Sequence, residues 1–136
     1  MFENQMKKVH FGGLLGERLQ ANLENWLLCA PSANPGMSDM FLRRDKTPRE
    51  RLVPWYSEFP GKYITSAAAA YACNPDPRLK TEVDELINRL VDAQHKSEAL
   101  LSPHPTKEGI AGKTEGWGDN GILKPLWELW GYYHLI

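Results

Sequence analysis

The sequence has little cysteine and no excess of charge of either sign. Its two cysteines, Cys29 and Cys73, stand alone, without a C-x-x-C pair or a neighbouring histidine. We therefore expect neither a disulfide framework nor a zinc site within this chain, and we predict that both thiols are small side chains of the core. The 16 basic and 17 acidic side chains give a net charge of −1. This balance argues against a general nucleic-acid binder and against a polybasic protein of membrane surfaces.

Long apolar runs and familiar catalytic fingerprints are missing as well. No run approaches the ~20 apolar residues that span a bilayer, and the first residues lack the apolar stretch of a signal peptide, so a cytoplasmic protein is expected. The four histidines are scattered, and neither H-E-x-x-H nor G-x-S-x-G occurs. Gly112-Lys113-Thr114 lacks the first glycine of a phosphate-binding loop, because position 107 is lysine. Metal, serine-nucleophile and nucleotide chemistry are not expected from these residues.

Helical periodicity dominates what is present. The spacing of apolar residues predicts a helix from Leu14 to Cys29, a helix from Lys62 to Cys73 that is apolar nearly all round, and an amphipathic helix from Pro77 to about Gln94. A last, aromatic helix is expected to begin near Pro125. Because a helix that is apolar all round is buried on most sides, we expect the second helix to be surrounded by neighbours.

The connections between these helices indicate a repeated hairpin. Asp76 suits an N-cap and Pro77 suits the first helical position, so the second and third helices are predicted to form an αα-hairpin with an inner and an outer member. The proline-rich residues 31–60 are read as an ordered excursion with a short helical turn, and residues 97–121 as a functional loop. The last helix weakly resembles the second, because an aromatic residue and an acid precede the apolar residues in both. The predicted fold class is therefore all-α, a helical toroid built of such hairpins.

Aromatic and acidic side chains gather at the predicted helix starts and in the loops. Sugar sites combine flat aromatic faces, which pack on the apolar side of a ring, with carboxylates or imidazoles that bond its hydroxyls. The alternative is that the aromatics are core and the acids are helix caps, and this alternative is preferred for Trp26, Tyr63 and Tyr71. For Glu58 and His134 neither interpretation prevails, because a polar group within dense apolar sequence needs a partner when buried. The candidate sugar-binding residues are His134, Glu58, Glu128, Trp55, Trp117 and Trp130.

Four segments, in order, resemble glycoside hydrolase family 127, the β-L-arabinofuranosidase group. Phe11 to Asn22 is similar to the family's opening G-x-x-x-x-R-x-x-x-N helix, and Glu58 to Ala67 resembles its E-F-x-G-K-[YW]-[IL] inner helix. The segment from Asp76 to Gln94 is similar to its outer helix, and Trp127 to Ile136 resembles the E-L-x-x-x-x-H-L-I opening of its next inner helix. This order of segments covers most of the chain.

The resemblance implies a fold and a reaction. The fold would be a partial (α/α)6 toroid, and the reaction would be hydrolysis of a β-L-arabinofuranoside with retention. In the family a zinc-bound cysteine thiolate is the nucleophile and a glutamate is the acid/base. These residues lie downstream and have no counterpart here, so no catalytic residue and no metal ligand is expected in this chain. His134 resembles a histidine that lines the sugar subsite, and Glu58 and Glu128 would also contact sugar.

The expected protein is thus residues 1–136 of a single helical-toroid catalytic domain, truncated at its C-terminus, because the last aromatic helix has no C-cap. Its partner would be an oligosaccharide or glycoside, bound weakly and not hydrolysed by this chain alone, and uncovered helix faces would favour self-association. Two alternatives stay open. The chain could belong to another toroidal sugar enzyme, a lyase or an epimerase, or it could be a helical scaffold without catalysis.

Overall fold

The computed structural model of this chain describes residues 11–45, 57–96, 101, 113–114, 124–125 and 128–135. This described part is predominantly helical, which confirms the all-α class. The elements, in chain order, are α1 (Gly13–Asn22), the π-helix η1 (Leu23–Leu27), α2 (Ala30–Ala33), α3 (Gly36–Arg43), α4 (Glu58–Cys73), α5 (Pro77–His95), β1 (Lys113–Thr114), β2 (Lys124–Pro125) and α6 (Glu128–Leu135).

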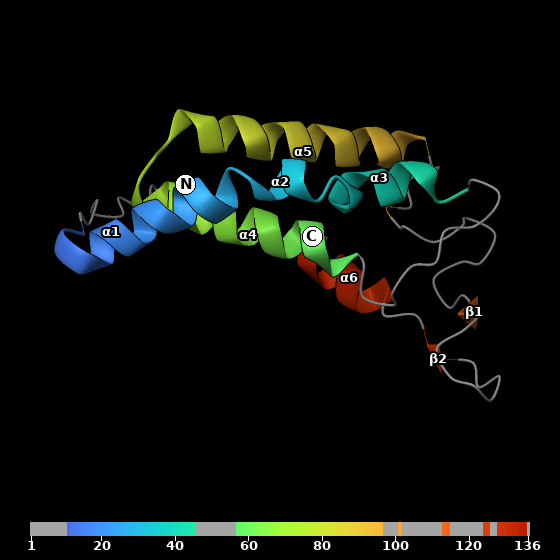
Figure 1. Ribbon diagram of the computed structural model, residues 1–136. Helices are drawn as coiled ribbons and strands as arrows, with labels where there is room; N and C mark the ends of the chain where they lie inside the picture. Colours follow the sequence, from blue (N-terminus) through green and yellow to red (C-terminus); the bar gives the residue numbers. More distant parts are fainter. Residues whose placement is uncertain are drawn as a thin grey trace, which may run out of the picture.

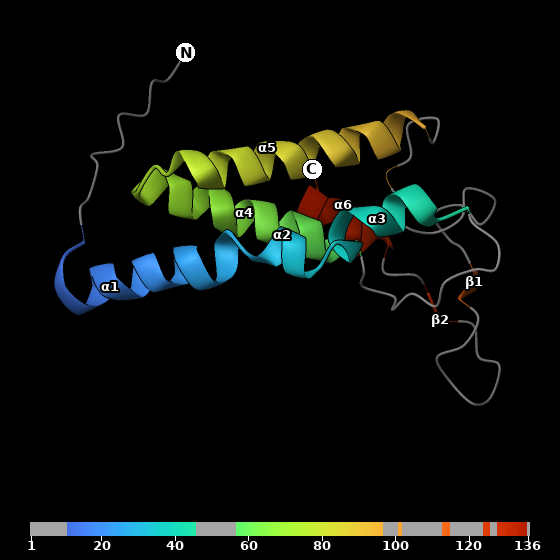
Figure 2. The same cartoon turned by 45° about the horizontal axis from the view of Figure 1, so that its top comes forward.

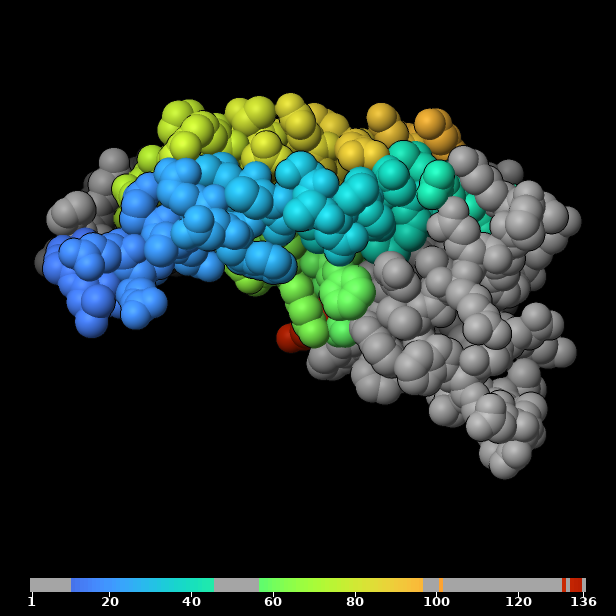
Figure 3. All heavy atoms as spheres, in the orientation of Figure 1, coloured from blue at the N-terminus to red at the C-terminus, as the bar shows by residue number. Residues whose placement is uncertain are grey.

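The helices lie in rows around α4. The segment from α1 to α3 forms one row and α5 forms another (Figures 1 and 2), and α4 contacts both. The space-filling view shows the α1 to α3 row as a continuous strip along one face, with α5 above it (Figure 3). The α6 helix lies against the beginning of α4. The two strands form a short antiparallel pair, with Lys113 opposite Pro125.

The α4–α5 hairpin has the predicted form. Asp76 caps α5, because its Oδ1 accepts the backbone N–H of Arg78 at 2.8 Å, and Pro77 opens the helix. The α4 helix begins at Glu58, four residues earlier than the predicted start at Lys62. Pro60 does not prevent this, because the first turn of a helix needs no N–H from that position. The earlier start adds Glu58 to the same helix as Lys62.

The first predicted helix is interrupted. The α1 helix ends at Asn22, and a π-turn follows in which the Leu28 N–H bonds to Leu23 O at 3.0 Å. The Tyr63 hydroxyl of α4 donates to Leu27 O at 2.7 Å and holds this turn against α4. The first part of the proline-rich segment, residues 31–43, is helical despite its prolines. Pro31 lies in the first turn of α2, where a proline is tolerated. The eight-residue helix α3 replaces the short helical turn that was expected.

The core lies where α5, α4, η1 and α3 meet. On α5 the buried side chains follow helical spacing, which confirms the amphipathic helix, although Val91 of the same stripe is 41% exposed. Met37, Met40 and Phe41 of α3 complete the core from a segment that was not expected to contribute a helix. The buried apolar residues are Leu23, Leu27, Ala30, Met37, Met40, Phe41, Tyr63, Ala67, Leu79, Leu86, Leu90 and Ala93.

Several burial predictions are wrong. Cys29 and Cys73 are exposed rather than core residues, and Trp26 is 58% exposed. The α4 helix is not buried on most sides, since Ala68 and Ala69 are exposed. For α4 the cause is packing on one side only: α5, α3 and η1 cover the face that carries Tyr63 and Ala67, and the opposite alanine face stays open. Tyr63 is buried as predicted, and Tyr71 is half-buried.

The last helix starts later than expected. Pro125 belongs to β2 and not to a helix, and α6 begins at Glu128. Proline fixes its own φ and lacks an N–H, so it fits an edge strand as well as a helix start. In the part of the chain that the structure describes, no helix has the length and apolar character needed to cross a membrane.

Candidate functional site

The structure describes the side chains of two of the six candidate residues, Glu58 and His134. Glu128 and Trp130 belong to α6, but their side chains lie outside what the structure describes. Trp55 and Trp117 lie outside the described residues altogether. The geometry of the site is therefore the geometry of the contact between α4 and α6, where Glu58 and His134 lie.

Two glycines let α4 and α6 approach closely. A Cβ added at Gly61 would lie 2.1 Å from the backbone oxygen of His134, and a Cβ at Gly131 would lie 1.8 Å from Ser57 Oγ. Both positions therefore require glycine. Ser57 lies beside Gly131, and Gly61 lies beside His134. The residue numbers of α4 and α6 therefore increase in the same direction along the contact, and the two helices are parallel.

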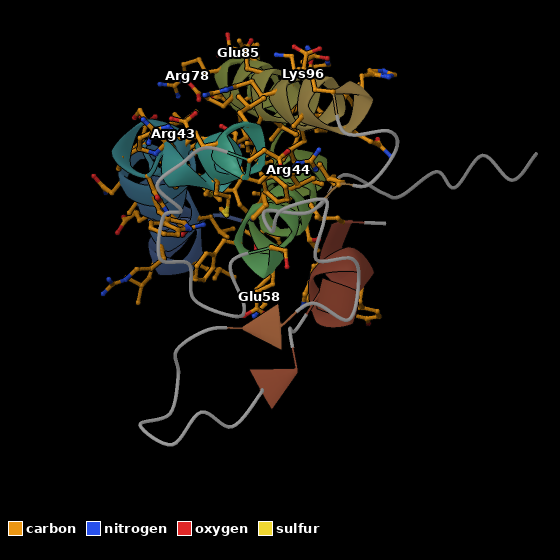
Figure 4. The ribbon with its side chains drawn as sticks, turned by 90° about the vertical axis from the view of Figure 1, so that its right-hand side faces the viewer. Arg43, Arg44, Glu58, Arg78, Glu85 and Lys96 are labelled. Carbon is orange, nitrogen blue, oxygen red and sulfur yellow. The ribbon has the colours of Figure 1, made fainter. Side chains whose placement is uncertain are left out.

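This contact brings Glu58 and His134 together. The distance from Glu58 Oε2 to His134 Nε2 is 3.8 Å, which is an ion-pair distance for a protonated imidazole and longer than a hydrogen bond. Both side chains are largely buried, at 10% and 17% exposure. Glu58 lies in the first turn of α4, at the end next to α6 and away from Glu85 and Lys96 (Figure 4). His134 lies in the last turn of α6.

Lys62 is a third member of this site, and the sequence prediction missed it. Its Nζ lies 2.9 Å from the same Glu58 Oε2, one helical turn along α4. The i,i+4 spacing of an acid and a lysine on one helix is a recognised ion-pair pattern and could have identified it. Lys62 is 52% exposed, so the cluster of Glu58, Lys62 and His134 reaches solvent through the ammonium group.

The cluster of Glu58, Lys62 and His134 suits binding better than bond cleavage. It offers carboxylate acceptors, ammonium donors and an imidazole nitrogen at one place. A hydroxyl group can donate a hydrogen bond to such acceptors and accept one from such donors. Hydrolysis of a glycoside generally uses a pair of carboxyl groups, and this cluster contains one. Within the described ranges, no group of three or more His, Cys, Asp or Glu side chains could hold a metal ion.

Ser57 adds a buried hydroxyl at the same helix contact. Its Oγ is shielded from solvent and has no hydrogen-bond partner among the residues that the structure describes, although it precedes α4 in the N-cap position. The side chain instead packs against Gly131. Ser57 therefore sets the spacing between the two helices rather than capping α4.

A second feature is an apolar groove between α1 and the open face of α4. Its volume is about 300 Å³, and Phe11, Leu19 and Ala70 are among the residues that line it, with the exposed Cys73 at its α4 end. The groove is separate from the cluster of Glu58, Lys62 and His134, because Cys73 and Glu58 are at opposite ends of α4. Its lining contains no charged side chain.

Charged groups tie η1 to the α4–α5 turn on the surface. Arg78 bonds Glu24 Oε1 and Asp76 Oδ2, each at 2.7 Å. The hydrogen bonds from Arg78 lower the pKa of Glu24 and the pKa of Asp76 below their usual values. Inside the core, burial and then the charge of Glu82 raise the pKa of Tyr63 to about 12, so its hydroxyl remains a donor to Leu27.

A comparison of the chain with protein-family models, with curated proteins and with solved structures found no match. The resemblance to glycoside hydrolase family 127 therefore rests on the four sequence segments.

Proposed function

We propose that this chain is the sugar-binding, N-terminal part of a retaining glycoside hydrolase of the family 127 type, which acts on β-L-arabinofuranoside-like glycans. The observation that carries the proposal is the cluster of Glu58, Lys62 and His134. Two of its members come from separate segments that resemble family motifs, and they lie 3.8 Å apart. A carboxylate, an ammonium group and an imidazole at one place match the donors and acceptors of a hydroxyl-rich ligand, which supports the proposal.

The directions of the helices support a partial (α/α)6 toroid. In a ring of hairpins whose inner and outer members alternate, consecutive inner helices run in the same direction, and the outer helix between them runs back. The α4 and α6 helices are parallel by the pairing of Ser57 with Gly131 and of Gly61 with His134. The α5 helix runs opposite to α4 (Figure 1). In this proposal α4 and α6 are inner helices and α5 is an outer helix.

The described residues do not fit the zinc centre that the family uses. Cys29 and Cys73 are exposed, and no group of metal-ligating side chains forms within the ranges that the structure describes. The role proposed for this chain is therefore recognition of the sugar, while the nucleophile and the acid/base belong to other residues of the family domain. We expect the chain alone to release no aryl alcohol from an aryl arabinofuranoside.

Titration of the ¹⁵N-labelled chain with methyl β-L-arabinofuranoside tests the proposal. We expect chemical shifts of the first turn of α4 and the last turn of α6 to change, with a millimolar dissociation constant of about 1 mM or weaker. Glu58→Gln and His134→Ala should each abolish the change, whereas Glu85→Gln, on the far side of α5, should leave it intact. Shift changes that avoid α4 and α6, or turnover of an aryl arabinofuranoside by the chain alone, would contradict the proposal.

One observation favours a second candidate, a non-catalytic helical scaffold. Leu14, Leu15 and Trp26 are 70%, 54% and 58% exposed on the α1–η1 segment, next to the apolar groove. Exposed apolar surface of this kind is typical of a face that another protein surface covers. A scaffold of this type would associate with itself through α1 and would show no shift changes with the arabinofuranoside, which separates the two candidates.

A further inference from the structure

The α1–η1 segment carries an apolar ridge that consists of Phe11, Leu14, Leu15, Leu19 and Trp26. These residues are between 38% and 70% exposed. With about 150–250 Å² for each whole side chain, the ridge exposes roughly 400–650 Å² of apolar surface. The largest apolar patch on a typical monomer covers about 300–600 Å² and is often functional. The ridge is therefore large enough to be a contact surface for another protein chain.

The ridge borders the apolar groove between α1 and α4, which run antiparallel (Figure 2). Leu15 and Leu19 lie four residues apart on one side of α1, and Leu19 also lines the groove. The α4 wall of the groove extends from Ser66 to Cys73, about 10 Å at 1.5 Å per residue. This wall includes the small side chain of Ala69. Because small side chains leave space for larger ones, a helix with a ridge of leucines can pack along the wall.

The charges around the groove indicate the kind of helix that fits it. The residues that line the groove carry no charge, so a charged side chain buried there would have no ion-pair partner in the lining and would be costly. The α1 helix itself meets this requirement, because its one acid, Glu17, and its one base, Arg18, cancel and its ridge is apolar. Its ten residues are about 15 Å long, enough to cover the α4 wall. A second copy of this chain thus supplies a helix that matches the groove in length, shape and charge.

We propose that two copies of this chain form a symmetric dimer in which the apolar ridge of each copy packs into the groove of the other. One face carries both the ridge and the groove, so a two-fold axis forms both contacts at once and closes the assembly at two copies. The two ridges together offer roughly 800–1,300 Å², at the low end of the about 1,200–2,000 Å² of stable interfaces, and the dimer is therefore reversible. The inference is independent of sugar binding, because the groove and the cluster of Glu58, Lys62 and His134 lie at opposite ends of α4.

The experiment measures the dimer dissociation constant of the full chain by sedimentation velocity over a dilution series. Ala68 and Ala69 are neighbouring exposed residues of α4, but only Ala69 is among the residues that line the groove. We expect Ala69→Glu to raise the dissociation constant about tenfold or more, because it places an unpaired carboxylate in the dimer contact. Ala68→Glu adds the same charge to the same helix outside the groove and should associate as the wild type does. Since both positions are exposed, both variants should keep the wild-type circular dichroism spectrum.

An isotope-filtered NOESY spectrum of a mixture of ¹³C-labelled and unlabelled chains locates the contact. We expect cross-peaks between the Leu15 methyl protons of one copy and the Ala69 methyl protons of the other. A chain that stays monomeric at the highest concentration, or species that grow beyond two copies without limit, would overturn the inference. Equal association of the Ala68→Glu and Ala69→Glu variants, or a dimer without these cross-peaks, would overturn it as well. None of these results bears on sugar binding at the α4–α6 contact, which its own titration tests.

Discussion

Replacing Gly61 with alanine should separate α4 from α6 and dismantle the cluster of Glu58, Lys62 and His134. The added Cβ would lie 2.1 Å from the backbone oxygen and 2.5 Å from the carbonyl carbon of His134. Ordinary contacts between carbon and oxygen are about 3.3 Å or longer, so α6 must withdraw by about 1 Å. No side-chain rotation relieves this overlap, because the atoms that it meets are two backbone atoms and the Cβ of His134, none of which moves when a side chain rotates.

The expected loss of stability follows from two opposing effects. Overpacking of this kind costs typically about 1–3 kcal/mol, and more where nothing can yield. Alanine in place of glycine within a helix returns about 0.5–1 kcal/mol. Because the backbone of His134 cannot yield, we take the upper end of the overpacking cost and expect Gly61→Ala to lower the free energy of unfolding by about 2 kcal/mol. For a domain that is stable by about 5–15 kcal/mol, this change is easily measured.

Gly131→Ala provides an internal comparison, because its overlap is with a side chain. Its Cβ would lie 1.8 Å from Ser57 Oγ and 2.4 Å from Ser57 Cβ, whereas the Ser57 carbonyl carbon is at an ordinary 3.4 Å. A second substitution, Ser57→Gly, should therefore recover most of the loss caused by Gly131→Ala. Ser57→Ala should recover little, and Ser57→Gly should do nothing for Gly61→Ala.

The assay is urea denaturation followed by far-UV circular dichroism, together with hydrogen exchange of the α6 amides. Gly12→Ala is the control, because nothing lies within 4 Å of the Cβ that it would add. We expect this control to lose less than about 1 kcal/mol and to keep α6 protected. If Gly61→Ala proves as stable as the Gly12→Ala control, with α6 equally protected, the close approach of α4 and α6 is wrong.

Three further predictions concern the core and the surface. Tyr63→Phe should lower the free energy of unfolding by about 1–2 kcal/mol by removing the donor to Leu27 O. Because the pKa of Tyr63 is raised from 10.0 to about 12, wild-type stability should decline from pH 10 to 12 more steeply than that of Tyr63→Phe. Arg78→Ala should lower the urea midpoint at pH 7, with a smaller effect in 1 M NaCl or at acid pH, where Glu24 and Asp76, whose pKa values are lowered in the folded chain, become protonated. Leu14→Lys with Leu15→Glu should reduce concentration-dependent association in sedimentation velocity, since both residues are exposed.

Local chemistry predicted the α4–α5 hairpin well. The Asp76-Pro77 pair fixes the start of α5 by itself, and α5 keeps its apolar stripe facing the core at Leu79, Leu86 and Leu90. Both signals depend only on neighbouring residues, so no knowledge of the tertiary structure is needed to read them.

Features that depend on distant partners could not be predicted in this way. The π-turn at Leu23–Leu27 is held by a hydrogen bond from Tyr63, a residue of another helix. Cys73 is exposed because packing covers one face of α4 and not the other, and Cys29, between η1 and α2, is exposed as well. The α3 helix was missed because the flanking prolines obscured Met37, Met40 and Phe41, whose spacing is helical.

In the candidate site, too, some features could be predicted from neighbouring residues and others depend on distant partners. Glu58 and His134 were singled out because each is a polar residue within apolar sequence, and the structure brings them to 3.8 Å. Lys62 is not among the predicted site residues, although its i,i+4 spacing from Glu58 indicates an ion pair on one helix. The close approach of the helices depends on pairing Gly61 and Gly131 with partners across the contact, and no spacing along the chain reveals that pairing.

The contact between Glu58 and His134 is tested most directly by a ¹³C-edited NOESY spectrum of the labelled wild-type chain. Atoms of the two side chains lie 3.8 Å apart, so we expect cross-peaks between the Glu58 γ-protons and the His134 ring protons. We also expect cross-peaks between the Gly61 α-protons and His134, whose backbone lies against that glycine. A spectrum in which α4 and α6 both show helical shifts but neither set of cross-peaks appears would contradict the site and the function proposed from it.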